Sequence, residues 1–306
     1  MDSNLLCDLF GAYFDARRNK RHTINALSFE VDYETKLFGL YEDIKNGEYC
    51  INPSVCFISF SPVQREIFAA DFRDRIVHHL IYNYISPLFE RLFIGDSYSC
   101  RVGKGTSRGV ERLGHFIRSC SHNYQKDCYV LKLDIMGYFM AIDHFVLYQK
   151  VERVINRFRY DVYFDVDLVL RLIRQVIFHD HVKNCRIKGK IKDWSGLPKS
   201  KSLFWAEKNK GLPIGNLTSQ LFGNVYLNDF DHFVKRTFVS DTLVSGALPS
   251  DFDKRATDAW SRYSVVATPI DSAGYAPPTL TRSLKGNFDV TGMSMSWILP
   301  YPRSAG

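Results

Sequence analysis

The stretch YVLKLDIMGYF, Tyr129–Phe139, brings one carboxylate to the end of an apolar run. A short apolar run of this kind predicts a strand, and Asp134 stands where that strand ends. The aromatic residue Phe139 follows five positions later. Acidic groups placed in this way usually act with a partner, so we expect a second carboxylate elsewhere in the chain.

A second segment with a distinctive pattern begins about 80 residues further on. Residues 211–231, GLPIGNLTSQLFGNVYLNDFD, predict a Gly/Pro turn followed by a long amphipathic helix. Thr218 or Asn216 is available as the N-cap of that helix. Either segment alone carries little information, because strands that end in Asp and Gly/Pro turns that enter helices are common.

In this order and spacing, the two segments resemble the palm of a reverse transcriptase. Two upstream segments look like successive fingers segments of the same family: REIFAADFRDRIVHHLI, residues 65–81, and DSYSCRVGKGTSRGVERL, residues 96–113. The resemblance covers roughly residues 1–238.

Within that family, the chain is most similar to the reverse transcriptases of diversity-generating retroelements. Ile214-Gly215 stands where most reverse transcriptases have Gln-Gly, and Ser219-Gln220 stands where most have Ser-Pro. DIMGYFMAID also resembles that group, although Met136 replaces a more usual Lys or polar residue.

The resemblance implies an α/β (α+β) fold with the fingers and a partial palm of a right-hand polymerase, followed by an irregular C-terminal tail. The expected parts are an N-terminal helical segment, the fingers, the partial palm and a non-homologous tail, at residues 1–60, 61–128, 129–238 and 239–306. The tail boundary rests on composition: residues 240–306 contain no Glu, His or Cys and hold six of the eleven prolines. Without a sustained hydrophobic period, such a segment is expected to be poorly ordered.

The implied activity is RNA-directed DNA polymerisation, an in-line phosphoryl transfer that uses two divalent cations about 4 Å apart. Mg²⁺ requires oxygen ligands, so carboxylates must converge at the ends of adjacent strands. In this family Asp134 would be the catalytic carboxylate and a metal ligand, and the carbonyl of Ile135 would add a backbone oxygen.

The resemblance also assigns nucleotide contacts. Arg65 and Arg75 would hold the triphosphate through charge-assisted hydrogen bonds. Phe139 would pack under the sugar and exclude ribonucleotides; without the resemblance, ordinary core packing would be the favoured interpretation of this residue. The turn and helix start would approach the templating base pair, because Gly has no Cβ; the residues expected there are Ile214, Gly215 and Gln220.

Ile214 has a consequence for fidelity. A Gln at this position can hydrogen-bond near the nascent base pair, whereas an Ile can only pack. The resemblance therefore implies error-prone cDNA synthesis, chiefly opposite template adenines. Further basic residues are expected to contact nucleic acid: Arg101, Lys104 and Arg108.

The family's next element, a hairpin carrying Tyr-x-Asp-Asp, is expected roughly 15–25 residues after Asp231, and the sequence there contains no Asp-Asp. SRYSVV resembles the approach to that motif, but Ser264, Val265 and Val266 are not useful Mg²⁺ ligands. Asp251 and Asp253 would share a strand face but lack apolar flanks. The composition change near Val239 indicates a frameshift, a recombination or a mispredicted gene.

We therefore expect a reverse transcriptase whose polymerisation is impaired, or alternatively a non-catalytic polymerase remnant that binds RNA. A viral-type RNA-dependent RNA polymerase is less favoured, because a bulky Phe139 disfavours ribonucleotides. The expected cofactor is Mg²⁺, two ions with an incomplete ligand set. The expected partners are template RNA, cDNA, dNTPs and a small basic accessory protein of the retroelement.

The elements that must position these residues follow from periodicity. Helices are expected over residues 1–50, around residues 110–123 and from about 143 to 181, and strands around Phe57–Phe60 and Glu66–Ala69. A helix over residues 73–93 should be kinked or broken at Pro87. His78 and His79 in that helix are expected to pack or to be hydrogen-bonded rather than to bind metal.

The bulk composition is that of a mostly globular chain of 306 residues with 45% hydrophobic residues and a formal net charge of +7. The basic balance is compatible with a polyanionic partner. Seven cysteines without a C-x-x-C pair favour free thiols in a reducing compartment. Without a secretory signal or an apolar run of membrane-spanning length, we expect a cytoplasmic protein with no membrane partner.

Overall fold

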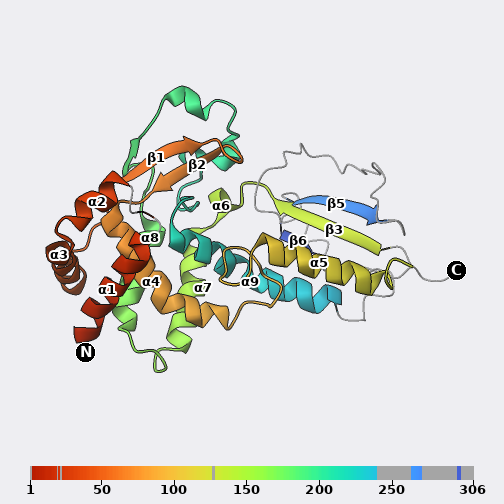
Figure 1. Ribbon diagram of the computed structural model, residues 1–306, viewed down its shortest axis with the longest axis horizontal. Coiled ribbons are helices and arrows are strands. Elements are labelled where there is room, and N and C mark those ends of the chain that lie inside the picture. Colours follow the sequence, from red (N-terminus) through yellow and green to blue (C-terminus); the bar gives the residue numbers. More distant parts are fainter. Residues whose placement is uncertain are drawn as a thin grey trace. The chain divides into compact units, whose positions relative to one another are not determined.

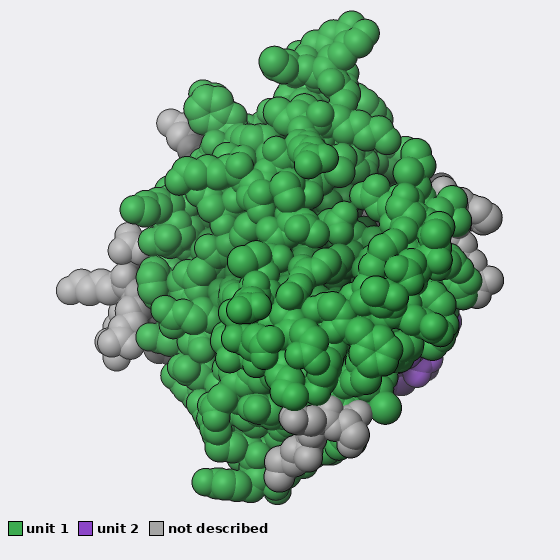
Figure 2. Space-filling view, turned by 90° about the vertical axis from the view of Figure 1, so that its left-hand side faces the viewer, with its two compact units in different colours: residues 1–93, 139–227 green, residues 94–138, 228–306 purple. Residues whose placement is uncertain are grey.

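The computed structural model describes residues 2–18, 20, 23–125, 128–239, 263–270 and 295–297, and shows a mixture of helices and small sheets. The chain divides into two compact units, which are described separately. Unit 1 comprises residues 1–93 and 139–227, and unit 2 comprises residues 94–138 and 228–306 (Figure 2).

Unit 1 holds most of the described helices and one three-stranded sheet (Figure 1). Its elements in chain order are α1 (Asp2–Arg17), α2 (Ile24–Glu30), α3 (Tyr33–Asn46), β1 (Ser54–Ser59), β2 (Arg65–Ala69), α4 (Phe72–Glu90), α7 (His144–Arg157), α8 (Val166–Phe178), β4 (Cys185–Ile187) and the short 3-10 helices η1 (Ile191–Trp194), η2 (Lys199–Lys201) and η3 (Leu203–Trp205). Unit 2 holds α5 (Thr106–Cys120), β3 (Cys128–Ile135), β5 (Tyr263–Ile270) and β6 (Met295–Trp297). Two helices contain residues of both units: α6 (Tyr138–Ala141) and α9 (Leu217–Val239).

The helices of unit 1 pack around α4, which contacts α1, α2, α7 and α8. The apolar residues of α4 recur at helical spacing, and Ile76, Leu80 and Ile81 are fully buried. Asp71 caps the helix by accepting a hydrogen bond from the Arg73 N–H at 3.1 Å. The expected break at Pro87 does not occur, since α4 continues to Glu90. Pro87 lies in the last turn, where few backbone hydrogen bonds remain to be lost.

The sheet of unit 1 has the strand order β2-β1-β4. β1 and β2 form an antiparallel pair in which Cys56 lies opposite Phe68, as the two apolar strand patterns indicate. β4 was not predicted from the sequence; it pairs in parallel with β1, with Cys185 opposite Ser54. A strand of three residues is too short to leave a periodic signal, so only its pairing defines it.

Glu66 is a buried carboxylate on β2 that binds the segment following β4. It is 1% exposed and accepts three hydrogen bonds: from Trp194 Nε1 at 2.6 Å, from Ser202 Oγ at 2.8 Å and from the Leu203 N–H at 2.6 Å. A carboxylate is tolerated in a protein interior only when its oxygens are satisfied in this way. Glu66 therefore fixes η1, through Trp194, and the start of η3, through Ser202 and Leu203, to the sheet.

A second buried carboxylate, Asp74, ties the chain before β1 to α4. It accepts hydrogen bonds from the Tyr49 hydroxyl and from the Asn52 N–H, both at 2.8 Å. Burial raises the pKa of Asp74 to about 6, against the lowering effect of these two donors.

Unit 2 contains a sheet with the order β5-β3-β6, in which both outer strands run antiparallel to β3. The described parts of the region expected to be irregular, residues 263–270 and 295–297, are thus strands. Their pairing partner β3 precedes them by more than 100 residues, so local composition could not predict it.

Asp96 joins three other parts of unit 2. It accepts hydrogen bonds from Tyr98 and Arg112 and pairs with Lys235 of α9 at 2.5 Å.

Among the helices in the described ranges, none combines the length and apolar composition that a bilayer crossing requires.

Replacing Glu66 tests its role in the fold. Glu66→Ala leaves the donors on Trp194, Ser202 and Leu203 without their acceptor, so we expect a loss of about 3 kcal/mol or more in the free energy of unfolding. Chemical denaturation followed by tryptophan fluorescence measures it. Glu42→Ala, at an exposed glutamate of α3, is the matched control and should change stability by less than about 0.5 kcal/mol. Equal stability of the two variants would contradict the assignment.

Candidate functional site

Three segments that are distant in the sequence are hydrogen-bonded to one another in unit 1. The turn that begins at Gly211 donates from the Leu212 N–H to the Phe139 carbonyl and from the Gly211 N–H to the Ile142 carbonyl, both at 2.8 Å. Further along the turn, the Ile214 carbonyl accepts a hydrogen bond from the Phe68 N–H of β2 at 2.8 Å. The turn therefore joins the residues after β3 to the free edge of β2.

Gly215 makes this close approach possible. Its φ is +129°, a backbone conformation that residues with a side chain rarely adopt. A Cβ at this position would lie 3.0 Å from both the Phe68 carbonyl oxygen and Ile67 Cγ2. The turn can lie against the β2 backbone only because residue 215 has no side chain.

Phe139 and Ile214 pack against the same apolar cluster. Its buried members are Cys56, Phe68, Met140 and Leu203. Both residues are only partly buried, so each contributes to the core and also reaches the surface of unit 1. This placement is compatible with core packing and with a contact to a bound nucleotide.

The two candidate N-caps of α9 make tertiary contacts. Asn216 directly precedes the helix, and its Oδ1 accepts a hydrogen bond from the Ala70 N–H at 3.3 Å. Thr218 Oγ1 lies 2.8 Å from His78 Nδ1. His78 is therefore hydrogen-bonded in the core, as expected, and burial lowers its pKa to about 3. Gln220 is exposed on the first turn of α9.

The two arginines expected at the triphosphate lie toward opposite ends of β2. Arg65 is the exposed first residue of the strand, and Arg75 is partly buried in α4, which follows the last residue. Since a strand rises about 3.3 Å per residue, β2 separates its ends by roughly 13 Å. Burial lowers the pKa of Arg75, which makes no ion pair with a residue of the described ranges.

Asp134 is partly buried near the end of β3, and its cross-strand neighbour is Ser264 of β5. Ile135 pairs with Tyr263 in the same register. The sequences of β5 and β6 contain no acidic residue. Within the part of the chain that the structure describes, no three His, Cys, Asp or Glu side chains gather as metal ligands. Asp251 and Asp253 lie outside the described residues.

The basic residues expected to contact nucleic acid in unit 2 have local partners. Arg101 Nη1 donates to the carbonyls of Ile94 and Ser97 at 2.9 and 2.8 Å. Lys104 Nζ donates to the Gly95 carbonyl at 2.6 Å, and Arg108 pairs with Glu111 at 3.1 Å. These contacts stabilise the loop after α4 and the first turns of α5. Nucleic-acid binding by the three residues stays a prediction.

The role of Glu66, which binds Trp194, Ser202 and Leu203 to the sheet, was not predicted from the sequence. The signal was present in the alternation of β2, where Glu66 shares its face with buried Phe68 and exposed Arg65 faces the other way. A Glu in phase with core residues indicates a buried carboxylate. The residues that satisfy it are about 130 positions away and could not be identified.

Comparison with known proteins yields one partial similarity. The chain is 23% identical over 168 residues to Protein YkfC of Escherichia coli (strain K12), a match that covers 55% of this chain and 36% of YkfC. The chain thus matches a little over a third of the length of this relative. No protein-family model matches the sequence.

Gly215→Ala tests the close approach of the turn to β2. The strained φ and the 3.0 Å contact with a backbone oxygen should lower the free energy of unfolding by about 1–3 kcal/mol. Gly11→Ala is the control, because Gly11 lies in α1 with no atom within 4 Å of the added Cβ. That substitution should stabilise by about 0.5–1 kcal/mol. Urea denaturation of both variants measures the difference, and a neutral Gly215→Ala would contradict the geometry.

Asp231 predicts a pH dependence of stability. It is 2% exposed in α9, its Oδ1 has no hydrogen-bond partner in the described part of the chain, and burial raises its pKa to about 7. Between the unfolded value of about 4 and this value, the folded state holds more protons than the unfolded state. The stability contribution of Asp231 is therefore lost as the pH rises from about 4 to about 7.

Asp231→Asn removes this titration. The variant should become progressively more stable than the wild type across that window, by up to about 4 kcal/mol above pH 7. Thermal and urea unfolding at several pH values measure the difference. Asp229→Asn, at an exposed residue two positions earlier, should show no such trend. A pH-independent difference for Asp231→Asn would refute the prediction.

Proposed function

We propose that this chain is a reverse transcriptase of the diversity-generating retroelement type that binds nucleic acid but is impaired in polymerisation. The observation that carries the proposal is the hydrogen-bonded meeting of three segments in unit 1. REIFA of β2, the segment from Phe139 to Ile142 and the GLPIGN turn contain residues that the sequence resemblance assigns to nucleotide binding. Chance similarity of separate segments gives no reason for them to meet.

The chemistry of Phe139, Ile214 and Arg75 supports a nucleotide ligand. Phe139 and Ile214 offer partly exposed apolar surface for a sugar and a base pair. Arg75 is a partly buried cation without an ion pair in the described part of the chain, and a triphosphate would neutralise such a group.

The donor set does not fit a two-metal site. Asp134 and the Ile135 carbonyl provide oxygen ligands at one strand end, but β5 and β6 beside them carry no acidic residue. Two Mg²⁺ ions need several convergent carboxylates, and one Asp cannot position both. For this reason the proposal includes impaired error-prone cDNA synthesis and retains the RNA-binding remnant as its non-catalytic form.

We also propose ligands, a partner and a location for such a protein. Template RNA, cDNA and dNTPs are the proposed ligands, and a small basic accessory protein is the proposed partner. The proposed location is the cytoplasm.

Primer extension tests the proposal. The chain should bind an RNA template annealed to a DNA primer but should not extend the primer with dNTPs in Mg²⁺ or Mn²⁺, because the sequence after Asp231 carries no Asp-Asp pair to join Asp134 in holding the two ions. Gel-shift and extension assays on the same complex separate the two steps. Extension that Asp134→Ala abolishes would overturn the impaired state. Absence of hybrid binding by the folded chain would overturn the reverse-transcriptase assignment itself.

A further inference from the structure

The net positive charge of the protein resides in one segment. Residues 183–210, here called the basic segment, contain nine Lys or Arg and two acidic residues. This excess of seven equals the formal net charge of the whole chain. Acidic and basic residues are therefore equal in number over the rest of the sequence, and a polyanion would be attracted to this segment above all.

The basic segment is held on the sheet of unit 1 (green, above β1 and β2 in Figure 1). Glu66 binds it through Trp194, Ser202 and Leu203. Gln64 Nε2 adds hydrogen bonds to the carbonyls of Asp193 and Ser195, at 2.9 and 3.1 Å. A surface fixed in this way loses little conformational entropy when a ligand binds.

Most of its basic side chains are unneutralised. Two lysines have acidic partners, Lys183 with Asp180 and Lys210 with Glu207. Several others are exposed and form no ion pair with any residue of the described ranges: Arg186, Lys188, Lys190, Lys192 and Lys208. Like charges gathered on a fixed segment repel one another, and binding of a polyanion would relieve that repulsion.

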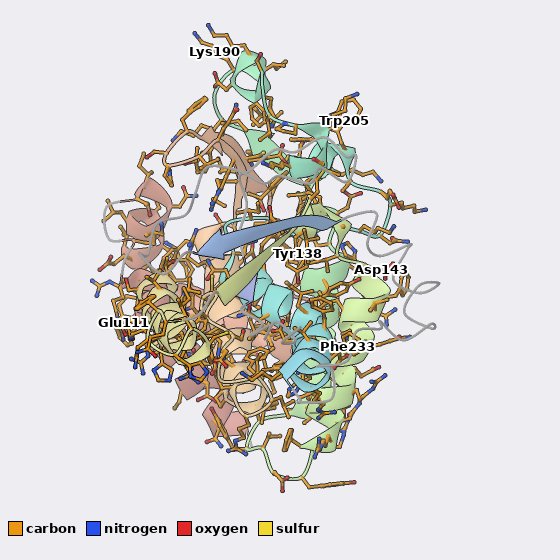
Figure 3. The ribbon with its side chains drawn as sticks, turned by 90° about the vertical axis from the view of Figure 1, so that its right-hand side faces the viewer. Glu111, Tyr138, Asp143, Lys190, Trp205 and Phe233 are labelled. Atoms are coloured by element: carbon orange, nitrogen blue, oxygen red, sulfur yellow. The ribbon has the colours of Figure 1, made fainter. Side chains whose placement is uncertain are left out.

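An exposed tryptophan accompanies these charges. Trp205 is 63% exposed, and Lys199 Nζ lies 4.2 Å from the centroid of its ring. Its neighbour Phe204 instead packs against Phe68, so the chain buries one aromatic residue and leaves the larger one in solvent. Figure 3 shows Trp205 and Lys190 toward the same end of unit 1.

We propose that the basic segment binds single-stranded nucleic acid, with its lysines on the phosphates and Trp205 stacked on an unpaired base. Lysine ammonium groups and an exposed aromatic face are the two elements that sequence-tolerant single-strand binding requires. The inference rests on the proposed function and adds a second surface to it, formed by exposed side chains of the basic segment rather than by Phe139 and Ile214.

An anionic membrane is a less suitable partner. Membrane-surface segments present a continuous apolar face, usually on an amphipathic helix. The basic segment contains a short strand and 3-10 turns, and its exposed Ile187 and Ile191 alternate with basic residues. Nucleic acid is therefore the ligand that the arrangement favours.

Fluorescence anisotropy with labelled oligo(U) at increasing salt tests the phosphate contacts on the full chain. Lys190→Gln with Lys192→Gln should weaken binding and lower the log–log salt slope by about 1.4, because each contacted phosphate contributes about 0.7 for a single strand. Arg153→Gln with Arg157→Gln removes the same charge from exposed positions on α7 and should leave the slope unchanged. Circular dichroism and thermal melts confirm that both variants are folded.

Trp205 is tested independently of charge. Trp205→Ala should weaken oligo(U) binding roughly tenfold without changing the salt slope, and Trp205→Phe should retain most of the affinity. Oligo(U) should also quench the fluorescence of Trp205, and this quenching should be absent in Trp205→Ala.

Three outcomes would overturn the inference. The first is an unchanged slope in the Lys190/Lys192 variant, and the second is full affinity in Trp205→Ala. The third is binding to phosphatidylserine vesicles without binding to oligo(U), which would assign the segment to a membrane. If the wild type binds the hybrid, any of these three outcomes would refute this inference alone, whereas absence of hybrid binding would refute the proposed function as well.

Discussion

The buried carboxylate of Glu66 is the interaction on which the rest of unit 1 depends. A charged group at 1% exposure is stable only if hydrogen bonds replace its lost hydration, and Glu66 receives three. All three come from a segment about 130 residues later in the chain. If that segment left the sheet, the Glu66 carboxylate and its three donors would lose their hydrogen-bond partners. The long polar connection is therefore held as an ordered surface.

β2 therefore supports two surfaces at once. One face carries Glu66 and, through it, the basic segment. Its free edge accepts the turn at Gly215, which is joined in turn to the Phe139 carbonyl region. A strand whose edge is covered by a turn is also protected from pairing with another chain. The proposed nucleotide-contact residues Phe139 and Ile214 and the proposed single-strand surface thus both depend on β2, and a change at β2 would alter both.

Binding and chemistry make different demands on such a scaffold. Binding to a polyanion depends on many exposed charges, each contributing a little, so it tolerates the loss of a few. Metal-assisted phosphoryl transfer depends on a few carboxylates at one point. Asp134 pairs across the sheet with Ser264, in a strand without acidic residues. Under the proposed function, such a chain would lose its chemistry while the proposed nucleic-acid surfaces persist.

The sequence by itself determined the helices, strands and turns that depend on patterns within a few residues. The helices of residues 1–50, the strands β1 and β2 and the turn before α9 were predicted, because apolar periodicity and Gly/Pro signals act over a few residues. The sequence also singled out β2, the segment around Phe139 and the Gly211–Gly215 turn, but not that hydrogen bonds join them. Tertiary contacts decided the rest. They supply the three donors to Glu66, the pairing of β4 with β1 and of β5 with β3, and the nearby carbonyls that accept hydrogen bonds from Arg101 and Lys104. These depend on which distant groups meet, and a buried charge or an unpaired strand edge acquires its partner only when the whole chain is packed.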